Sequence, residues 1–528
     1  MIQLIQDFIA EHANTSPDAI ALQFKDQQVS YRQLQVEIAH FAEALLTLGV
    51  GPGERVAVYL PKQLETVYAL FGTAQAGACF VPVNPVLKPR QLAHLLPHCN
   101  VRVLVTNRQR LSSLTPVLKQ CSDLHTVVLV DGDSKVESSA QVSGWETFIG
   151  SRDSREPHPR IDSDMAAILY TSGSTGHPKG VVLSHRNLIA GADSVATYLH
   201  NNSEDRVLAV LPLSFDAGLS QLTTAFSVGA TAVLMDYLLP RDVIRAVARY
   251  GITGLAAVPP LWNQLRDLPW PAEAAESLRY ITNTGGAMPV STTRALQAAL
   301  PSTQIYLMYG LTEAFRSTYL PPEDVNARPD SIGKAIPNAD IMVINDTGEP
   351  CRANEPGELV HRGALVSLGY WNDPVKTAER FKPCPVTPRE IPTLELAVWS
   401  GDQVVRDEQG YLYFVGRKDE MIKTSGYRVS PTEVEEVADT TGLVSAAAAI
   451  GVPHAELGQA IALIVSANVE DQEKLINDIL VACRRDLPNY MIPLQVIVKA
   501  ALPLNQNGKI DRRNLAEEYH QLFQDPSA

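Results

Sequence analysis

Residues Tyr170-Thr-Ser-Gly-Ser-Thr-Gly-His-Pro-Lys-Gly180 decide the fold class of this chain. An apolar strand is predicted before them, over 166–169, and another after them, over 181–183. The glycines allow a tight loop whose backbone N–H groups converge on an anion, and the hydroxyls and Lys179 add donors and positive charge. A triphosphate tail requires these groups. The spacing is not that of the Walker loop, so the sequence disfavours the fold of P-loop NTPases.

Strands and helices alternate on both sides of this loop, which is typical of βαβ units that build parallel sheets. The regions 206–235 and 252–284, after the loop, repeat the alternation and predict two similar halves. Before the loop we predict a helix over 4–13, a hairpin over 20–24 and 29–31, strands over 55–60, 79–83 and 101–106, and helices over 65–76 and 90–96.

The pattern changes twice toward the C-terminus. After about residue 332, short strands with Gly, Pro and Asn-Asp turns predict a small β-rich subdomain. After Arg417, a compact α+β domain is predicted from helices over 434–438 and 472–487 and strands over 446–450 and 460–466.

The predicted fold class is α/β. A large N-terminal domain of two βαβ-type subdomains plus a small β-rich subdomain is followed by a small, mobile α+β C-terminal domain. We assign residues 1–416 to the N-terminal core, 417–419 to a hinge and 420–528 to the C-terminal domain.

Composition and charge argue against several classes of function. The chain has 528 residues, with 44 Lys and Arg against 58 Asp and Glu, so its formal charge is −14. This acidic balance, without a long basic run, argues against binding of nucleic acid or of a membrane surface. The N-terminus lacks a signal-peptide pattern and no apolar run reaches the length of a membrane span, so we expect a cytoplasmic protein. The scattered cysteines form no CxxC pair and are expected to be reduced thiols.

Further motifs follow one another along nearly the whole chain. Together with the loop at 170–180 they resemble those of the adenylate-forming ligases, which include acyl-CoA synthetases, firefly luciferase and nonribosomal adenylation domains. One such motif is weak evidence, but this many in order are highly specific. They are Tyr309-Gly-Leu-Thr-Glu313, Trp399-Ser-Gly-Asp402, Gly416-Arg-Lys-Asp419, Ser425-Gly-Tyr-Arg428, Leu487-Pro-Asn-Tyr-Met-Ile-Pro493 and Asn507-Gly-Lys509.

The resemblance implies an enzyme that uses ATP and Mg²⁺ to convert a carboxylate into an acyl-adenylate. Tyr309 would stack on adenine, and Asp402 has two acceptor oxygens for the ribose hydroxyls. Thr312 would bond the α-phosphate, and Glu313 would hold Mg²⁺, which prefers carboxylate oxygen. As isolated residues, Tyr309 is more typical of a core and Asp402 of a turn. The remaining implied ATP-binding residues are Thr171, Ser172, Gly173, Ser174, Thr175, Gly176, Lys179, Gly285, Gly286, Ala287, Gly310 and Arg417.

Lys509 follows Asn-Gly, a tight turn that projects a long cation. By resemblance it stabilises charge that develops during adenylation, although a lysine after Asn-Gly is by itself more often a solvated turn residue. The resemblance further implies that the C-terminal domain rotates about Asp419 for the second half-reaction. Gly426 would then let a phosphopantetheine thiol approach past a residue without a side chain.

The segment Leu211-Pro-Leu-Ser-Phe-Asp-Ala-Gly218 bears on the acyl substrate. Many acyl-CoA synthetases have His where this chain has Phe215, whereas Phe-Asp is the pattern of amino-acid-activating members. Asp216 is therefore the candidate partner of a substrate ammonium, and the alternative is an Asp that caps the following helix. Arg316 either faces an acid group of the substrate or is salt-bridged within the scaffold. By motif, the pocket comprises Phe215, Asp216, Ala217, Ser220, Ala257, Thr282, Thr284, Met308, Arg316 and Ser317.

The segments from Phe215 and from Glu313 resemble free-standing ligases that load a small amino acid, notably proline, onto a separate carrier protein. No carrier segment follows Lys509 before Ala528, so a carrier protein is expected to act in trans. The alternative acceptor is CoA, with a non-amino carboxylic acid as substrate. A luciferase-like oxidase and a non-catalytic relative are further alternatives; the intact Lys179, Glu313, Asp402 and Lys509 argue against the second of these.

Overall fold

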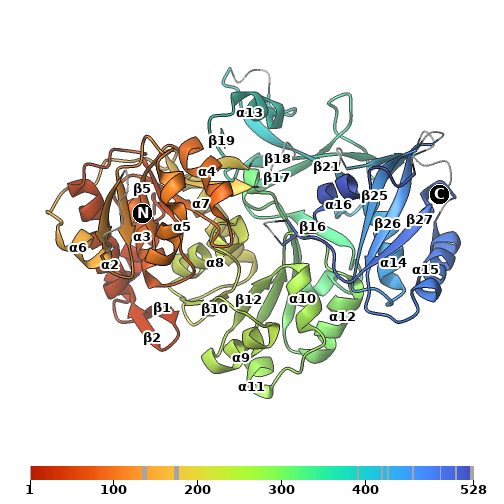
Figure 1. Ribbon diagram of the computed structural model, residues 1–528, viewed down its shortest axis with the longest axis horizontal. Coiled ribbons are helices and arrows are strands. Elements are labelled where there is room, and N and C mark those ends of the chain that lie inside the picture. The colour runs from red at the N-terminus through yellow and green to blue at the C-terminus, as the bar shows by residue number, and fades with distance from the viewer. Residues whose placement is uncertain are drawn as a thin grey trace.

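Three sheets organise the residues that the computed structural model describes, which are 2–133, 140–171, 178–388, 390, 392–417, 420–424, 427–454, 457–487, 489–505 and 508–523. Two sheets with parallel centres form two halves of the N-terminal part, and the third sheet lies in the C-terminal part, drawn in blue in Figure 1.

The first half is built on eight described strands. In spatial order these are β19 (Gly369–Tyr370), β9 (Lys179–Ser184), β8 (Met165–Thr171), β4 (Cys79–Pro82), β3 (Arg55–Val58), β5 (Val101–Thr106), β6 (Thr126–Leu129) and β7 (Gln141–Gly144). The pairs from β8 to β7 are parallel, and β9 and β19 close one edge in antiparallel fashion. The helices here are α1 (Asp7–Thr15), α2 (Tyr31–Thr47), α3 (Leu64–Gln75), α4 (Pro89–His98), α5 (Arg108–Leu118) and α6 (Trp145–Gly150).

Strand β3 shows why helices cover both faces of this sheet. Successive side chains of a strand point to opposite faces. Val56 and Val58 belong to the core that includes residues of α2 and α3. Ala57, between them, belongs to a second core with residues of α4 and α5. A strand that is apolar on both sides therefore lies between two helical layers.

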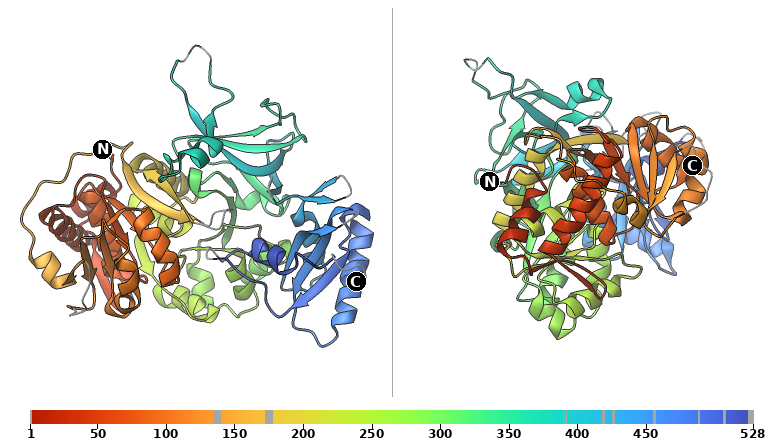
Figure 2. Two further views of the ribbon diagram at one scale, coloured as in Figure 1. Left: turned by 45° about the horizontal axis from the view of Figure 1, so that its top comes forward. Right: turned by 90° about the vertical axis from the view of Figure 1, so that its left-hand side faces the viewer.

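The second half is built on fourteen described strands. Along the path these are β17 (Ala339–Ile344), β18 (Pro356–Gly363), β21 (Leu396–Arg406), β22 (Leu412–Arg417), β16 (Ser331–Ala335), β15 (Thr318–Leu320), β14 (Gln304–Tyr309), β13 (Tyr280–Asn283), β12 (Gly254–Ala257), β10 (Arg206–Ala209), β11 (Thr231–Leu234), β1 (Ile20–Phe24) and β2 (Gln27–Ser30), with β20 (Phe381–Pro383) paired to β21. Strands β14, β13, β12, β10, β11 and β1 are parallel neighbours. The antiparallel strands from β15 to β17 continue the sheet into the predicted β-rich part, which stands above both halves in Figure 2.

The helices of this half again cover both faces. Val207 and Ala209 of β10 pack in the core shared with the first half, and Leu208 packs in another core on the opposite face. The helices are α7 (His185–Tyr198), α8 (Asp216–Ser227), α9 (Pro240–Tyr250), α10 (Pro259–Leu265), α11 (Ala272–Ser277), α12 (Val290–Ala299) and α13 (Pro374–Arg380), with the 3₁₀ turns η1 (Thr312–Ala314) and η2 (Pro322–Asp324).

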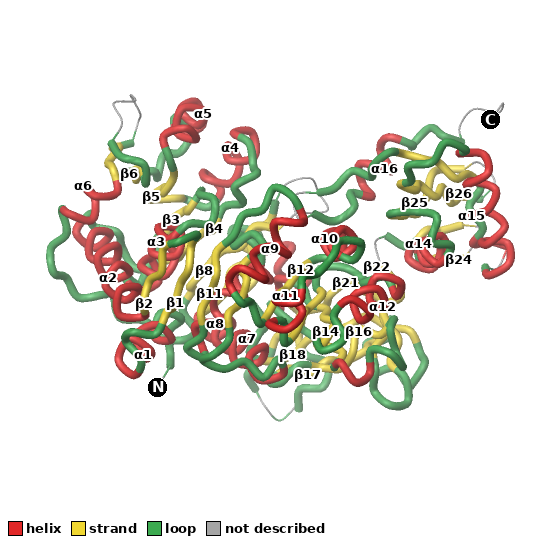
Figure 3. Tube along the Cα trace, turned by 90° about the horizontal axis from the view of Figure 1, so that it is seen from below, coloured by secondary structure: helices red, strands yellow, loops and turns green. Residues whose placement is uncertain are grey.

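The C-terminal part is a sheet with helices on both faces, set apart at one end of the molecule in Figure 3. Its described strands, in order, are β24 (Tyr427–Val429), β23 (Ile422–Thr424), β26 (Gly458–Ser466) and β25 (Ala446–His454), with β27 (Gln495–Lys499) paired to β26. Its helices are α14 (Pro431–Thr440), α15 (Gln472–Asp486) and α16 (Arg512–Glu518), with the 3₁₀ turn η3 (Asn489–Met491). Leu463 faces the core with α14 and α15, and Ile464 faces the core with α16.

The predicted fold class is confirmed. The predicted strands 20–24 and 101–106 coincide with β1 and β5. The prediction of a strand over 29–31 is wrong at Tyr31, which begins α2. Ser30 and Gln33 form a capping box in which the Ser30 hydroxyl accepts from the Gln33 N–H and the Gln33 side chain accepts from the Ser30 N–H, and this starts the helix at once.

The division into domains at 417–419 stays a prediction, and the proposed hinge residue Asp419 lies outside the described residues. None of the described helices combines the length and apolarity that crossing a membrane requires.

Candidate active site

Four neighbouring parallel strands, β10, β12, β13 and β14, end at one edge of the second sheet. Ligands of open α/β sheets bind at the carboxyl ends of the strands, where the loops converge. Ala257 is the last residue of β12 and Tyr309 the last residue of β14. Thr284 directly follows β13, and Asp216 lies in the segment after β10. The sheet thus gathers at one edge residues that the sequence places in separate motifs.

Tyr309, Asp402 and Arg417 come together beside this edge. Strands β21 and β22 place Asp402 opposite Arg417, and Nη1 of Arg417 lies 3.6 Å from Oδ1 of Asp402. The Tyr309 hydroxyl donates to Oδ2 of Asp402. Burial raises the pKa of Asp402, and Arg417 and the Tyr309 hydrogen bond oppose that rise. Oδ1 of Asp402 is buried and accepts no hydrogen bond from the described residues, so it fits a donor such as a ribose hydroxyl.

Lys509 reaches the same edge from the C-terminal part. A Cβ on Gly285, whose φ is +79°, would lie 3.6 Å from Cε of Lys509. The turn is tied by Asn505, whose N–H donates to the Lys509 carbonyl at 2.7 Å and whose Oδ1 accepts from the Lys509 N–H at 3.1 Å. Gly508 has the positive φ, +73°, that the predicted tight turn needs; Asn507 lies outside the described residues.

Several surrounding groups act on the pKa of Lys509. Its side chain is exposed to solvent, yet enough protein surrounds it that desolvation lowers the pKa of its ammonium, while Asp216 and Asp402 raise it. Asp216 belongs to the candidate acyl pocket and Asp402 to the candidate ribose site. Lys509 therefore interacts electrostatically with a residue of each candidate site.

Thr312 and Glu313 begin η1, shortly after β14 ends. The Tyr370 hydroxyl donates to Oε1 of Glu313 at 2.6 Å, and Nζ of Lys179 lies 5.0 Å from the centroid of the Tyr370 ring. Tyr370 therefore links the predicted metal ligand to the predicted phosphate-binding lysine. Thr171 pairs directly with Lys179 between β8 and β9. Of the predicted nucleotide and thiol residues, Ser172, Gly173, Ser174, Thr175, Gly176 and Gly426 lie outside the described residues.

Asp216 is the first residue of α8, and Phe215 is its N-cap. Oδ1 of Asp216 accepts from the Ala217 N–H at 2.7 Å, and Oδ2 lies 3.7 Å from Nη1 of Arg316. The side chain of Arg316 is 6% exposed and that of Asp216 is 17% exposed. Asp216 is therefore not the N-cap of α8, and its carboxylate faces the Arg316 guanidinium. Its role as partner of a substrate ammonium stays a prediction.

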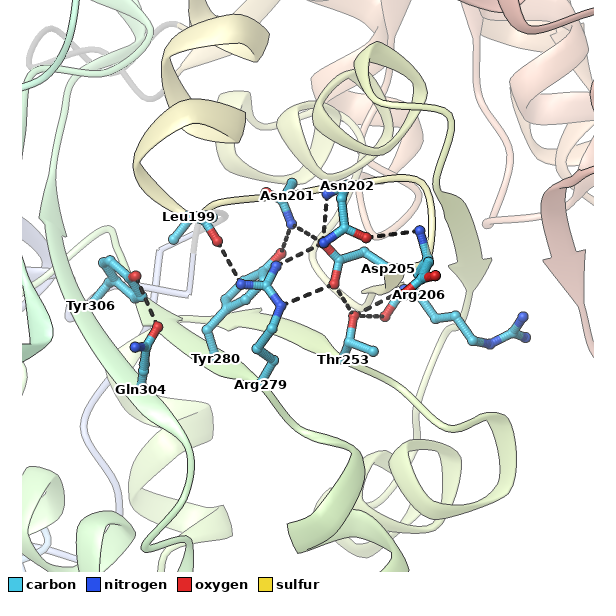
Figure 4. A network of polar contacts seen from close by, with 11 residues as sticks. Leu199, Asn201, Asn202, Asp205, Arg206, Thr253, Arg279, Tyr280, Gln304 and Tyr306 are labelled. Carbon is cyan, nitrogen blue, oxygen red and sulfur yellow. Dashed lines mark hydrogen bonds and ion pairs between the residues drawn. The ribbon is translucent and has the colours of Figure 1, made fainter. Parts of the chain in front are cut away.

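Arg316 differs from a fully bonded structural arginine, as Figure 4 illustrates with Arg279. Arg279 donates to both carboxylate oxygens of Asp205 and to the Leu199 carbonyl. Asp205 precedes β10, at the amino ends of the parallel strands and away from the site edge. Arg316 has the ion pair at 3.7 Å, and its buried Nε donates no hydrogen bond to the described residues.

The backbone is strained at Phe315, the residue before Arg316. Phe315 has φ +56°, which is rare for a bulky side chain. Its ring is fully buried against Gly191 of α7, where any side chain would collide with it. Such strain persists only where the surroundings enforce it, and it clusters at functional sites.

The other predicted pocket residues lie in or next to the strands and helix that form the edge. Ser317 contacts Nδ1 of His361 through its hydroxyl at 2.9 Å, and the sulfur of Met308 accepts from the Tyr198 hydroxyl at 3.5 Å. The Thr284 N–H donates to the Ala257 carbonyl at 3.2 Å. The buried members are Ala217, Ser220, Ala257, Thr282, Thr284, Met308, Arg316 and Ser317, whereas Gly286 and Ala287 are exposed beside Gly285 and Gly310 is half-buried.

Comparison with known proteins decides the family. The family described as AMP-binding enzyme matches residues 9–371, and the AMP-binding enzyme C-terminal domain matches residues 433–509. The chain belongs to the AMP-binding enzyme family. The predicted resemblance to adenylate-forming ligases is confirmed, and the protein is an AMP-forming acid–thiol ligase.

Relatives of this AMP-binding enzyme include two kinds of protein. The long-chain-fatty-acid–CoA ligase of Salmonella typhimurium is 31% identical, over 96% of this chain and 93% of its own length. A linear gramicidin synthase of Brevibacillus parabrevis is 30% identical, over 96% of this chain and 6% of its own length. The crystal structure of the anthranilate CoA ligase AuaEII with anthranoyl-AMP is 25% identical, covers 98% of this chain and 97% of its own, and has a TM-score of 0.85.

The residues present fit ATP and Mg²⁺. Oδ1 of Asp402, buried without a donor among the described residues, suits a ribose hydroxyl. Mg²⁺ is commonly bound through one or two carboxylates together with substrate phosphates, so the carboxylate of Glu313, oriented by Tyr370, is a suitable ligand. Bound there, the ion would neutralise charge on the phosphates.

Two residues of the site were not found from the sequence. Tyr370 was missed because an isolated aromatic residue before Trp-Asn-Asp carries no spacing signal. Arg380 donates to the Trp399 carbonyl at 3.0 Å and opposes the rise in the pKa of Asp402. It was missed because only the pairing of β20 with β21 brings its neighbourhood to the ribose site.

Proposed function

We propose that this AMP-binding enzyme adenylates an amino acid and transfers the aminoacyl group to the phosphopantetheine thiol of a separate carrier protein. The observation that supports the proposal is the carboxylate of Asp216, a predicted pocket residue, which lies close enough to Lys509 to raise the pKa of the lysine. A substrate with an ammonium group next to its carboxylate complements an anion beside a cation.

The pairing also explains how plain acids would be discriminated against. An ammonium group bound at Asp216 gains a charge-assisted contact in a largely desolvated site. An acid without the amine leaves this contact unmade. We propose L-proline as the first amino acid to test, because the segments that begin at Phe215 and Glu313 resemble ligases that load it.

The proposed chemistry begins with attack of the substrate carboxylate on the α-phosphate of ATP, which releases pyrophosphate. The carboxylate is already ionised near neutral pH, so no general base is needed. Tyr309 and Asp402 position the nucleoside, Thr312 the α-phosphate, and Lys509 stabilises the charge that develops in the transition state. A thiol then attacks the carbonyl of the adenylate, and AMP leaves.

We further propose that the two half-reactions use two positions of the C-terminal domain. Lys509 lies at the nucleotide edge here, which suits adenylation. Rotation about Asp419 would remove Lys509 and bring Gly426 to the thiol path.

A second function is supported by the contact between Asp216 and Arg316. Because Arg316 already neutralises Asp216 at 3.7 Å, an acid without an amine leaves that pair intact. The enzyme would then transfer a non-amino acyl group to CoA, as the names of the CoA ligases among its relatives indicate for those proteins.

The two functions are separated by substrate-dependent exchange of pyrophosphate into ATP, measured over the amino acids and a panel of short acids. The proposal predicts a response limited to one or a few amino acids, lowered about 100-fold in Asp216→Asn, since removing one partner of a buried pair costs about 3 kcal/mol or more. Asp242→Asn is the matched control, because Asp242 lies in the first turn of α9. A response only to acids without an amine would favour the second function.

A further inference from the structure

Lys62 lies at the boundary between the two halves of the N-terminal part and is almost fully buried there. It follows β3 of the first half, and its side chain is 6% exposed. Its Nζ lies 2.8 Å from Oδ1 of Asp236 and donates to the Val210 carbonyl at 3.0 Å and the Leu211 carbonyl at 3.3 Å. The Lys62 N–H also donates to Oδ2 of Asp236 at 2.9 Å. The ammonium of Lys62 thus binds a carboxylate and two backbone carbonyls of the second half.

These acceptors all follow the carboxyl ends of parallel strands. Val210 and Leu211 come directly after β10, and Asp236 lies shortly beyond β11, the parallel neighbour of β10. Strand β3 belongs to the other sheet, so Lys62 joins the carboxyl ends of strands from both sheets. Ligands of open α/β sheets bind at such ends. The buried ammonium therefore fastens the site edge of the second half to the first half.

The segment that begins at Leu211 leads into Asp216 through a closely packed turn. The Phe215 N–H donates to the Pro212 carbonyl at 3.1 Å, which closes the turn. The same carbonyl lies so close to α8 that it leaves no room for a side chain at Gly218. The turn is therefore pressed against the first turns of the helix that Asp216 begins.

A side chain of α8 holds the same segment from the other side. Oε1 of Gln221 accepts from the Leu211 N–H at 3.1 Å, and its Nε2 donates to the Leu208 carbonyl at 2.7 Å. Leu211 is thus bonded through its carbonyl to Lys62 and through its N–H to the helix. A displacement of the backbone at Leu211 is therefore passed on to the start of α8, where Asp216 lies.

Burial makes this arrangement sensitive to loss of the ammonium. Burial lowers the pKa of Lys62, and the charge of Asp236 and its hydrogen bond oppose that fall. Lysine is rarely buried to this extent unless it is paired. If the ammonium is removed, two backbone carbonyls lose a charged donor in a place where little water replaces it, which costs free energy. The segment after β10 then has reason to move.

We infer that Lys62 is a positioning residue for adenylation, which holds the segment 210–215 and, through it, Asp216 in place for the acid substrate. Lys62 acts through the backbone of this segment. A misplacement of about 1 Å caused by a distant substitution can cost about 100-fold in rate. The inference rests on the proposed place of Asp216 in the acyl pocket, but not on whether the acid carries an amine.

The test measures ATP–pyrophosphate exchange against the concentration of ATP and of whichever acid supports exchange. Lys62→Met keeps an apolar stem of similar length and removes the ammonium. It is expected to raise the KM for the acid about tenfold or more and to change the KM for ATP less than about twofold, because the contacts of the acid are the ones disturbed. Lys62→Arg, which keeps the charge and the donors, is expected to give a KM for the acid between those of wild type and Lys62→Met.

Arg279→Met is the matched control, because it removes a paired cation at the opposite end of β10. Arg279 donates to Asp205, which precedes this strand (Figure 4). The control is expected to lower the melting temperature without raising the KM for the acid. An unchanged KM for the acid in folded Lys62→Met, or an equal rise in Arg279→Met, would overturn the inference.

Asp236→Asn decides the question if Lys62→Met does not fold. The side chain of Asp236 is 46% exposed, and asparagine keeps an oxygen for the Lys62 N–H, so the variant is expected to fold. Its KM for the acid should rise about threefold. An unchanged KM for the acid in both Asp236→Asn and Lys62→Arg would overturn the inference.

Asp216→Asn separates this inference from the proposed function. If Asp216→Asn impairs use of the acid and the variants of Lys62 do not, the positioning role alone is refuted. If neither Asp216→Asn nor the variants of Lys62 affect use of the acid, the proposed pocket is refuted and the inference with it.

Discussion

Replacing Lys509 with Ala is expected to slow adenylate formation by about 10²–10³-fold and to spare thioester formation. The lysine lies against Gly285, and the charges of Asp216 and Asp402 both act on it. A unit charge about 4 Å from a developing charge is worth roughly 4 kcal/mol at the effective dielectric of a protein surface. Removal of one preorganised donor to a transition state costs about 2.7–4 kcal/mol. The two estimates agree on two to three orders of magnitude.

The assay measures the two half-reactions separately on the same variant. ATP–pyrophosphate exchange reports adenylation, and release of AMP from a chemically prepared acyl-adenylate in the presence of thiol reports the second step. Lys499→Ala is the control, because Lys499 belongs to the same domain and pairs with Glu518 at the surface. Equal loss of both steps in Lys509→Ala would refute the two-position account, and a loss below about tenfold in adenylation would refute the role of Lys509.

Three further predictions concern charged groups of the described structure. Asp402→Asn is expected to raise the KM for ATP about 30-fold, because it loses a charge-assisted hydrogen bond worth about 2 kcal/mol. The preference of the enzyme for ATP over 2′-deoxy-ATP should become smaller. An unchanged KM for ATP would show that Asp402 does not belong to the ribose site. The rate of exchange is expected to fall at an alkaline pH below the ordinary lysine pKa, because desolvation by the surrounding protein lowers the pKa of Lys509. Thiolation of a supplied adenylate should not show this fall in rate, and a fall shared by both steps would contradict the assignment. Burial, with Glu435 and Glu436, raises the pKa of Asp439 to about 7, so the folded domain holds a proton that the unfolded chain releases at lower pH, and stability is lost as the pH rises through about 7. Asp439→Asn is expected to stabilise the C-terminal domain by up to about 4 kcal/mol at pH 8 and by up to about 2 kcal/mol at pH 5. Thermal denaturation at the two pH values would show the difference, and equal effects would contradict the raised pKa.

The fold class followed from the sequence because local patterns and tertiary packing agree. Strands such as 101–106 are largely buried on both faces, which is what a parallel sheet between two helical layers requires. A tight turn before Lys509 was predicted from Asn-Gly, and the positive φ of Gly508 agrees with it. Where two local signals competed, as at Tyr31, the capping box of Ser30 and Gln33 prevailed over the strand pattern.

The pairing of side chains within the site was not predictable. Asp216 and Arg316 are 100 positions apart, and only the ends of β10 and β14 bring them within 3.7 Å. The sequence left two alternatives for each residue, and the structure shows that they face one another. Tyr370 likewise meets Glu313 only through the pairing of β19 with β9.

The central claim, that Asp216 selects for an amine, is tested most directly with a substrate and its analogue that lacks the amine. We would measure kcat/KM for adenylation of L-proline and of cyclopentanecarboxylate by wild-type enzyme, and extend the comparison to other amino acids and their deamino analogues. The account predicts a preference of about 100-fold or more for an amino acid over its analogue, from about 3 kcal/mol of charge pairing at Asp216. A ratio near one, or a preference for the deamino acids, would contradict it.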